Sequence, residues 1–123
     1  MANLHPTVAV VDDDESLRRS LGRLLDAYGF IPLKYDSAEA FLNRSPDAIV
    51  ECLLLDIDLG GMSGLELQRK LNANDPKIPV IFITALEDVR LKNTAMRAGC
   101  TAYFQKPFPA SALIAAINRA LGL

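Results

Sequence analysis

The chain has 123 residues, a formal net charge of −2 and 50% hydrophobic residues. This length fits one domain over residues 1–123 and leaves no room for a second. The charge gives no electrostatic footprint for nucleic acid or an anionic membrane, and no apolar run approaches the ~20 residues of a membrane span, so we expect direct binding to neither.

Strand-like and helix-like segments alternate five times along the sequence. In chain order we predict a strand at 7–11, a helix at 17–28, a strand at 31–35, a helix at 38–43, a strand at 51–56, a helix at 65–72, a strand at 79–83 running into Thr84, a helix at 88–98, a strand at 102–105 and a helix at 110–121.

Local signals mark several of these boundaries. Ser37 is a natural N-cap, Gly29 and Gly99 end helices, with Gly99 as a C-cap, and Pro109 suits the first helical position. Pro32 places the second strand at a sheet edge. The first helix should bury residues at helical spacing, namely Leu17, Leu21, Leu24, Leu25 and Tyr28.

Strands that alternate with helices of about ten residues predict βαβ units with right-handed crossovers. The expected fold is therefore α/β: a flavodoxin-like (βα)5 domain with a doubly wound, parallel, five-stranded sheet in the order 2-1-3-4-5. That order puts the first and third strands side by side.

Polar residues follow four of the predicted strands. Asp12 and Asp13 come after the first strand, Asp56 ends the third, Thr84 follows the fourth and Lys106 follows the fifth. In open α/β sheets the ligand crevice lies just outside the carboxyl ends of the strands. Carboxylates, a hydroxyl and an ammonium should therefore meet at one edge of the sheet.

Three neighbouring carboxylates repel one another unless a cation neutralises them, and Mg²⁺ suits such oxygen ligands. The side chain of Asp58 should point away from Asp56, but its backbone carbonyl could join the metal ligands. With the metal in place, Asp56 can attack phosphorus, while Thr84 and Lys106 bind the phosphoryl oxygens.

The single histidine, His5, excludes a His-based metal site and a Ser-His triad. Cys52 and Cys100 fit neither a metal spacing nor a disulfide framework, and we interpret both as small buried side chains in a reducing compartment, the cytoplasm. The first six residues lack the basic region and long apolar run of a signal peptide.

The same residues carry a family likeness. Over residues 7–121 the chain resembles the receiver domain of two-component response regulators. The matching stretches are Val11-Asp12-Asp13, Leu55-Asp56, Met62-Ser63-Gly64-Leu65-Glu66-Leu67, Ile83-Thr84-Ala85, Ala98-Gly99 and Lys106-Pro107-Phe108.

The resemblance implies that Asp56 accepts a phosphoryl group from a sensor histidine kinase or a phosphotransfer protein. It implies a cis peptide between Lys106 and Pro107. The other roles that it implies are Mg²⁺ ligands at Asp12 and Asp13, a switch hydroxyl at Thr84, a phosphate-binding amine at Lys106 and an aromatic that moves with Thr84 at Tyr103. An edge-strand aromatic packed on the last helix is the alternative for Tyr103.

Phosphorylation adds negative charge, and we expect it to reshape the face formed by the fourth helix, fifth strand and fifth helix, including Asn93, Arg97 and Tyr103. The partner there would be an output domain or a second receiver, and the kinase would dock near residues 16–20. Segments 37–42 and 95–99 resemble the FixJ-like subgroup, whose receivers usually precede a helix-turn-helix domain that regulates transcription. The chain stops at Leu123, which fits either a stand-alone receiver or an excised domain.

The loop after the acceptor departs from the family pattern. Leu59-Gly60 stands where receivers often have Met-Pro, and a glycine there should raise the entropic cost of ordering the loop around Mg²⁺. Asp58 adds an acid at a variable position, where it could repel a phosphodonor or a hydrolytic water.

Two other functions use some of the same residues. Asp56-Ile57-Asp58 matches the nucleophile and acid pair of haloacid dehalogenase-type phosphohydrolases, but no cap follows it and the other acids precede it. A pseudo-receiver that docks without phosphoryl chemistry is the second alternative, which the complete set of acids, Thr84 and Lys106 disfavours. A flavin-binding domain would need a phosphate loop after the first strand, and this chain lacks one.

Overall fold

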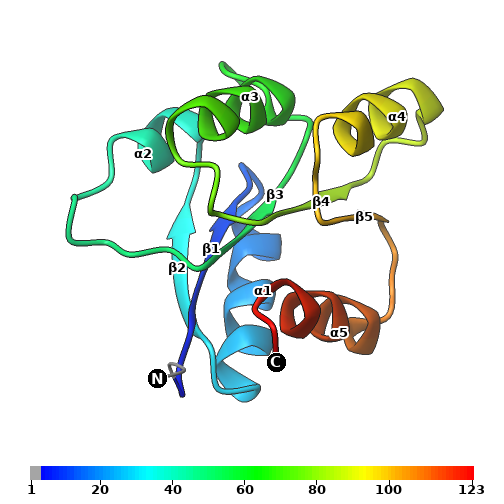
Figure 1. The fold of residues 1–123 in the computed structure, drawn as a ribbon. Helices are drawn as coiled ribbons and strands as arrows, with labels where there is room; N and C mark the ends of the chain where they lie inside the picture. Colours follow the sequence, from blue (N-terminus) through cyan, green and yellow to red (C-terminus); the bar gives the residue numbers. More distant parts are fainter. Residues whose placement is uncertain (1–3) are drawn as a thin grey trace.

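The computed structural model describes residues 4–123, which form one parallel sheet and five helices (Figure 1). The strand order is β2-β1-β3-β4-β5, as the sequence predicts. The elements are β1 (Thr7–Val11), α1 (Glu15–Ala27), β2 (Ile31–Tyr35), α2 (Ala38–Leu42), β3 (Cys52–Leu55), α3 (Gly64–Asn74), β4 (Val80–Thr84), α4 (Val89–Arg97), β5 (Ala102–Gln105) and α5 (Ala110–Ala120).

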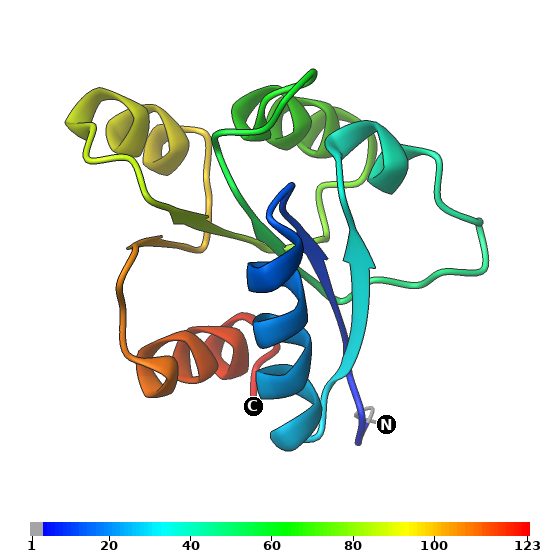
Figure 2. The same ribbon diagram turned by 180° about the vertical axis from the view of Figure 1, so that it is seen from behind.

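Helices cover both faces of the sheet. Helices α2, α3 and α4 lie on one face, and α1 and α5 lie on the other (Figures 1 and 2). Successive residues of β3 therefore enter two cores: Leu53 and Leu55 pack with α2–α4, whereas Cys52 and Leu54 pack with α1 and α5. Burial on both faces explains why the inner strands read as continuous apolar runs.

Side-chain caps fix where most helices begin. The Ser37 hydroxyl accepts a hydrogen bond from Ala40 N–H at 3.0 Å, as predicted, and the Asp14 carboxylate caps α1 through Leu17 N–H at 3.2 Å. Asp88 starts α4 in the same way. Each cap satisfies backbone donors that the first helical turn leaves unpaired.

Some predicted helix details are wrong. Pro109 has extended backbone angles and is the N-cap of α5, so it precedes the first helical position. Ala98 is the C-cap of α4, and Gly99 follows it in the left-handed region with φ 92°. Tyr28 lies at the C-cap of α1, past its apolar face, and is 56% exposed instead of buried.

Helix α3 runs two residues further than predicted, to Asn74. The Asn72 side chain donates to the carbonyl of Ala98 at 2.8 Å, which ties this last turn to α4. The helix ends at the C-cap Asp75, whose successor Pro76 disfavours helical geometry in the residue before it.

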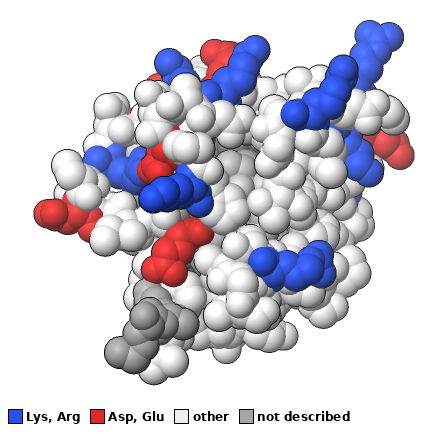
Figure 3. Space-filling view, viewed as in Figure 1, with Lys and Arg blue, Asp and Glu red and all other residues white. Residues whose placement is uncertain are grey.

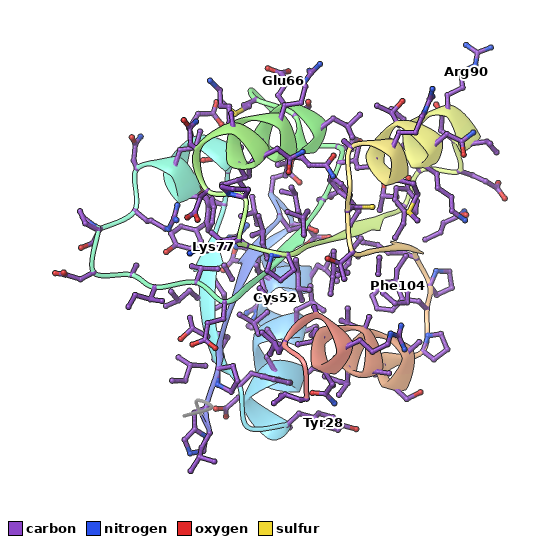
Figure 4. The ribbon with its side chains drawn as sticks, viewed as in Figure 1. Tyr28, Cys52, Glu66, Lys77, Arg90 and Phe104 are labelled. Carbon is purple, nitrogen blue, oxygen red and sulfur yellow. The ribbon has the colours of Figure 1, made fainter. Side chains whose placement is uncertain are left out.

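Both cysteines are buried and free, as predicted (Figure 4 labels Cys52 within the sheet). Burial raises the pKa of the Cys52 thiol to about 12, so this group is unreactive at neutral pH. No helix in residues 4–123 is both long and apolar enough to cross a membrane. The expectation about a signal peptide rests partly on residues 1–3, which lie outside the described residues.

Candidate functional site

Strands β1 and β3 bring the predicted carboxylates together. In the register Val11 pairs with Leu55, and Asp56 N–H donates to the carbonyl of Val11 at 3.0 Å. The next residues, Asp12 and Asp56, are therefore neighbours at the carboxyl edge of the sheet. Carboxylate oxygens of Asp12, Asp13 and Asp56 all lie within 4.8 Å of one another.

Asp56 is a buried acid with a raised pKa. Its residue is 8% exposed, and its Oδ1 accepts a hydrogen bond from Asp58 N–H at 3.0 Å. The pKa of Asp56 is raised from 3.8 to about 6: burial raises it most and the charges of Asp12 and Asp13 also raise it, whereas the hydrogen bond from Asp58 N–H and the charge of Lys106 lower it. A bound cation would stabilise the ionised carboxylate.

Lys106 reaches the same edge from the end of β5. Its Nζ lies 3.4 Å from Asp12 Oδ2 and 3.8 Å from Asp56 Oδ2. Its backbone N–H donates to the carbonyl of Thr84 at 2.8 Å, and the peptide bond to Pro107 is cis, as the resemblance implies. The ammonium thus sits between two acids, where it can also bind an anion.

Thr84 ends β4, and Tyr103 lies on the neighbouring strand β5, opposite Phe82. Thr84 is fully buried, and its hydroxyl accepts a hydrogen bond from Leu86 N–H at 3.0 Å. The Tyr103 ring is tilted against Phe82 with 6.2 Å between centroids, and its hydroxyl is buried without a hydrogen-bond partner. Tyr103 packs with the α2–α4 core and not on the last helix, which contradicts the alternative reading of this side chain.

The acids differ in exposure. Asp12 is 2% exposed, whereas Asp13 and Asp58 are exposed. The Asp58 carboxylate is outside the cluster of three that could hold a metal, as expected from its position, and its backbone N–H faces Asp56. Asp58 is therefore placed to contribute main-chain atoms to this edge.

Two residues without a predicted role hold the site backbone. Arg18 Nη1 donates to the carbonyl of Asp12 at 2.7 Å, which fixes the turn after β1. Gly64 packs directly against the carbonyl of Asp56, and a Cβ there would also lie 2.8 Å from Ile57 Cα. Only the matching stretch 62–67 pointed to Gly64, and the sequence offered no signal for Arg18.

The arrangement combines oxygen donors, a nucleophile and an anion-binding cation. The oxygens of Asp12, Asp13 and Asp56 are the hard ligands that Mg²⁺ prefers, and their crowding favours a cation, so the residues present fit this metal. Asp56 offers a nucleophilic carboxylate, and Lys106 a point charge for a phosphoryl oxygen.

Comparison with known proteins shows the family of the chain. A family model described as the response regulator receiver domain matches residues 8–118. The transcriptional regulatory protein FixJ of Rhizobium meliloti is 42% identical over 114 residues, which are 93% of this chain and 56% of that protein. FixJ of Azorhizobium caulinodans is 39% identical over 94% of this chain and 54% of its own length. The chain spans just over half the length of these relatives.

Solved structures agree in fold. The crystal structure of FixJ-N has 40% identity and a TM-score of 0.88, with 99% of this chain and 96% of that chain covered. The BeF3-activated DrrB receiver domain has 29% identity and a TM-score of 0.86, with 97% and 99% covered. These matches argue against the dehalogenase alternative. The chain belongs to the response regulator receiver domain family.

Proposed function

We propose that Asp56 accepts a phosphoryl group from the phosphohistidine of a sensor histidine kinase or a phosphotransfer protein. One observation carries this proposal. In a chain of the receiver family, the buried Asp56 lies beside Asp12, Asp13 and Lys106 at the carboxyl edge of the sheet. Each of these residues then has a role in phosphoryl transfer.

Asp12, Asp13 and Asp56 would hold Mg²⁺ through carboxylate oxygens, together with the backbone carbonyl of Asp58. When bound, Mg²⁺ neutralises the acids and the charge on the phosphoryl oxygens. Arg18 supports this set because it fixes the carbonyl of Asp12.

Phosphoryl transfer joins a carboxylate oxygen of Asp56 to phosphorus and breaks the phosphorus–nitrogen bond of the donor histidine, whose imidazole leaves with the bonding electrons. The Asp58 N–H fixes the other Asp56 oxygen through the 3.0 Å hydrogen bond. Lys106 and Thr84 would bind the equatorial oxygens. Asp56 is consumed in the step, so the chain acts as a phosphoacceptor that assists only its own phosphorylation and dephosphorylation.

Thr84 and Tyr103 would convert the modification into a change of shape. The Thr84 hydroxyl accepts a hydrogen bond from Leu86 N–H, and it would donate its own hydrogen to the phosphoryl group. A cavity of about 240 Å³ beside Tyr103, lined also by Leu86, Val89, Lys92 and Gln105, leaves room for rearrangement of the α4-β5-α5 face. Phosphorylation would bias two arrangements that already exchange.

The α4-β5-α5 face, with Asn93 and Arg97, would bind an output domain or a second receiver. Positively charged side chains project over α3 and α4 in Figure 3, and Arg97 is exposed on α4. The kinase would dock on the start of α1, because this helix begins beside Asp12.

The relatives named as transcriptional regulators support a role in transcription through an output domain. The two free cysteines support the proposed location in the cytoplasm, where thiols stay reduced. The single sheet supports the interpretation of residues 1–123 as one receiver domain.

Intact-mass spectrometry after incubation with acetyl phosphate tests the proposal. We expect a Mg²⁺-dependent gain of one phosphoryl group (about 80 Da) in the wild type and none in Asp56→Ala. An adduct that survives in Asp56→Ala would mean that another residue is the acceptor. If the wild type forms no adduct and beryllofluoride changes no amide resonance, the chain is a docking module. Steady turnover of p-nitrophenyl phosphate would instead support a phosphohydrolase.

A further inference from the structure

The loop between β3 and α3 contains two adjacent glycines close to the acceptor. Gly60 and Gly61 are both exposed, and Gly61 has a φ of 75°, in the left-handed region that favours glycine. A loop of this composition loses much conformational freedom when it becomes ordered. Asp58, whose backbone carbonyl is a proposed Mg²⁺ ligand, lies in the same loop, two residues before Gly60.

The far end of this loop is joined to helix α2. Oε2 of Glu39 accepts a hydrogen bond from Met62 N–H at 3.2 Å. Gly61 makes the approach possible, since a Cβ on Gly61 would lie only 2.6 Å from the same oxygen. The carboxylate therefore occupies the space that any other residue at position 61 would fill.

Helix α2 is a firm support for Glu39. Ala38 and Phe41 are fully buried on either side of Glu39 in the sequence, and Ser37 caps the helix. The Phe41 ring packs edge-on against Tyr35 with 5.3 Å between centroids, and the Arg44 guanidinium lies 4.2 Å from the Phe41 centroid. An exposed carboxylate on a helix fixed in this way can restrain a flexible loop.

We propose that Glu39 is a positioning residue for the proposed Mg²⁺ site: its bond to Met62 N–H holds loop 59–63 in the conformation that presents the Asp58 backbone. The inference rests on the proposed function of Asp56. The hydrogen bond between Glu39 and Met62 N–H offsets the entropic cost of ordering the loop, which Leu59-Gly60 raises in this chain. Glu39 does not touch the metal; it lowers the cost of ordering the loop when the metal binds.

Variants at Glu39 and Glu66 separate the effect of the hydrogen bond to Met62 N–H from the effect of negative charge. Glu39→Ala removes the acceptor, and Glu39→Gln keeps an acceptor oxygen without the charge. Glu66→Gln is the matched control, because Glu66 is an exposed acid of α3 that points outward (Figure 4). In Mg²⁺-free protein, we expect the Met62 amide to exchange about tenfold faster in Glu39→Ala and near the wild-type rate in the other two.

Isothermal titration calorimetry with Mg²⁺ measures the effect of each variant on metal affinity. We expect the dissociation constant of Mg²⁺ to rise about threefold to tenfold in Glu39→Ala and to change less than about twofold in Glu39→Gln and Glu66→Gln. Phosphorylation by acetyl phosphate should slow at low Mg²⁺ and recover at saturating Mg²⁺. An equal loss in Glu39→Gln and Glu66→Gln would assign the effect to charge and overturn the proposal.

A double-mutant cycle with Gly61→Ala tests the contact itself. In the wild type this change should displace Glu39 and expose the Met62 amide, whereas in the Glu39→Ala background only the strain of the positive φ remains. The two substitutions should therefore cost less together than the sum of their separate effects. Additive costs, or unchanged Met62 exchange in Glu39→Ala, would overturn the proposal. A wild-type protein that fails to bind Mg²⁺ would instead defeat the proposed function, whatever Met62 exchange shows.

Discussion

Nζ of Lys106 lies 3.8 Å from Oδ2 of Asp56, although the two residues are fifty positions apart in the sequence. The ammonium lowers the pKa of Asp56, but burial outweighs it and the result is a pKa of about 6. With this pKa, the protonated and ionised forms of Asp56 are close in free energy near neutral pH, even with Lys106 beside it. A second cation, or a bound phosphoryl group, would shift this balance.

Replacing Lys106 with Met removes the ammonium and keeps most of the aliphatic chain. We expect the pKa of Asp56 to rise above 6, because a lowering charge is lost while Asp12 and Asp13 remain. Phosphorylation by acetyl phosphate should slow about tenfold to a hundredfold, which corresponds to one lost charge-assisted hydrogen bond. Carbon-detected NMR titration of the Asp56 carboxyl and intact-mass kinetics measure the two effects.

Lys77→Met is the matched control, because Lys77 is an exposed lysine on the loop before β4 (Figure 4). It should leave both the titration and the rate unchanged. If Lys106→Met phosphorylates as fast as the wild type, the ammonium does not bind the phosphoryl group.

Gly60, in the loop after β3, and Gly64, the first residue of α3, provide a matched pair of substitutions. A Cβ at Gly64 would collide with the carbonyl of Asp56 and lie 2.8 Å from Ile57 Cα, whereas a Cβ at Gly60 meets nothing within 4 Å. We expect Gly64→Ala to lower the free energy of unfolding by about 1–3 kcal/mol, because backbone must shift. Gly60→Ala should be neutral or stabilising by up to about 1 kcal/mol, since it restricts the unfolded chain.

Urea unfolding with Mg²⁺ absent measures both changes. Gly64→Ala should also shift the amide resonance of Asp58, because the Asp56 backbone moves. Equal stability of the two variants would contradict the close packing of Gly64 on Asp56.

The alternation of strands and helices predicted the parallel α/β fold, because each inner strand is an apolar run buried on both faces. The sheet order was expected by analogy with flavodoxin-like sheets, and the structure has that order. The meeting of the site residues at one edge was also predictable, because the strands are parallel and Asp56 directly follows β3. Hydrogen bonds from a side chain to the backbone of another element or turn were not predictable. Arg18 reaches the Asp12 carbonyl, and Glu39 reaches Met62, through rotamers that no local pattern specifies. Helix α3 ends later than predicted for the same reason, because Asn72 donates a hydrogen bond to the carbonyl of Ala98.

Tyr103 has a buried hydroxyl without a hydrogen-bond partner. An unpaired buried hydroxyl costs free energy, so Tyr103→Phe should raise the free energy of unfolding of the unphosphorylated protein by about 0.5–1 kcal/mol. Tyr28→Phe is the control and should change it little, because Tyr28 is 56% exposed. Thermal unfolding compares the two. A clear loss of stability in Tyr103→Phe would show that the hydroxyl has a partner in solution, such as a bound water.

The raised pKa of Asp56 makes stability depend on pH in Mg²⁺-free protein. Below the unfolded value of 3.8, both the folded and the unfolded states hold the proton, and the fold carries no penalty. As pH rises toward about 6, the unfolded state ionises first, so stability falls, and above that pH the loss is complete. The size of the raise corresponds to roughly 3 kcal/mol.

Asp56→Asn keeps the shape and the acceptor for Asp58 N–H but cannot ionise. We expect it to be more stable than the wild type at pH 7.5 by up to about 3 kcal/mol, with a gap that closes as pH falls through 6 toward 4. Asp47→Asn, at an exposed acid, should show no such gap. Urea unfolding across this pH range, repeated with Mg²⁺, measures the effect; the metal should stabilise the wild type and leave Asp56→Asn nearly unchanged. A wild type that is as stable as Asp56→Asn at pH 7.5 without metal would mean that the Asp56 charge is already neutralised by its protein neighbours.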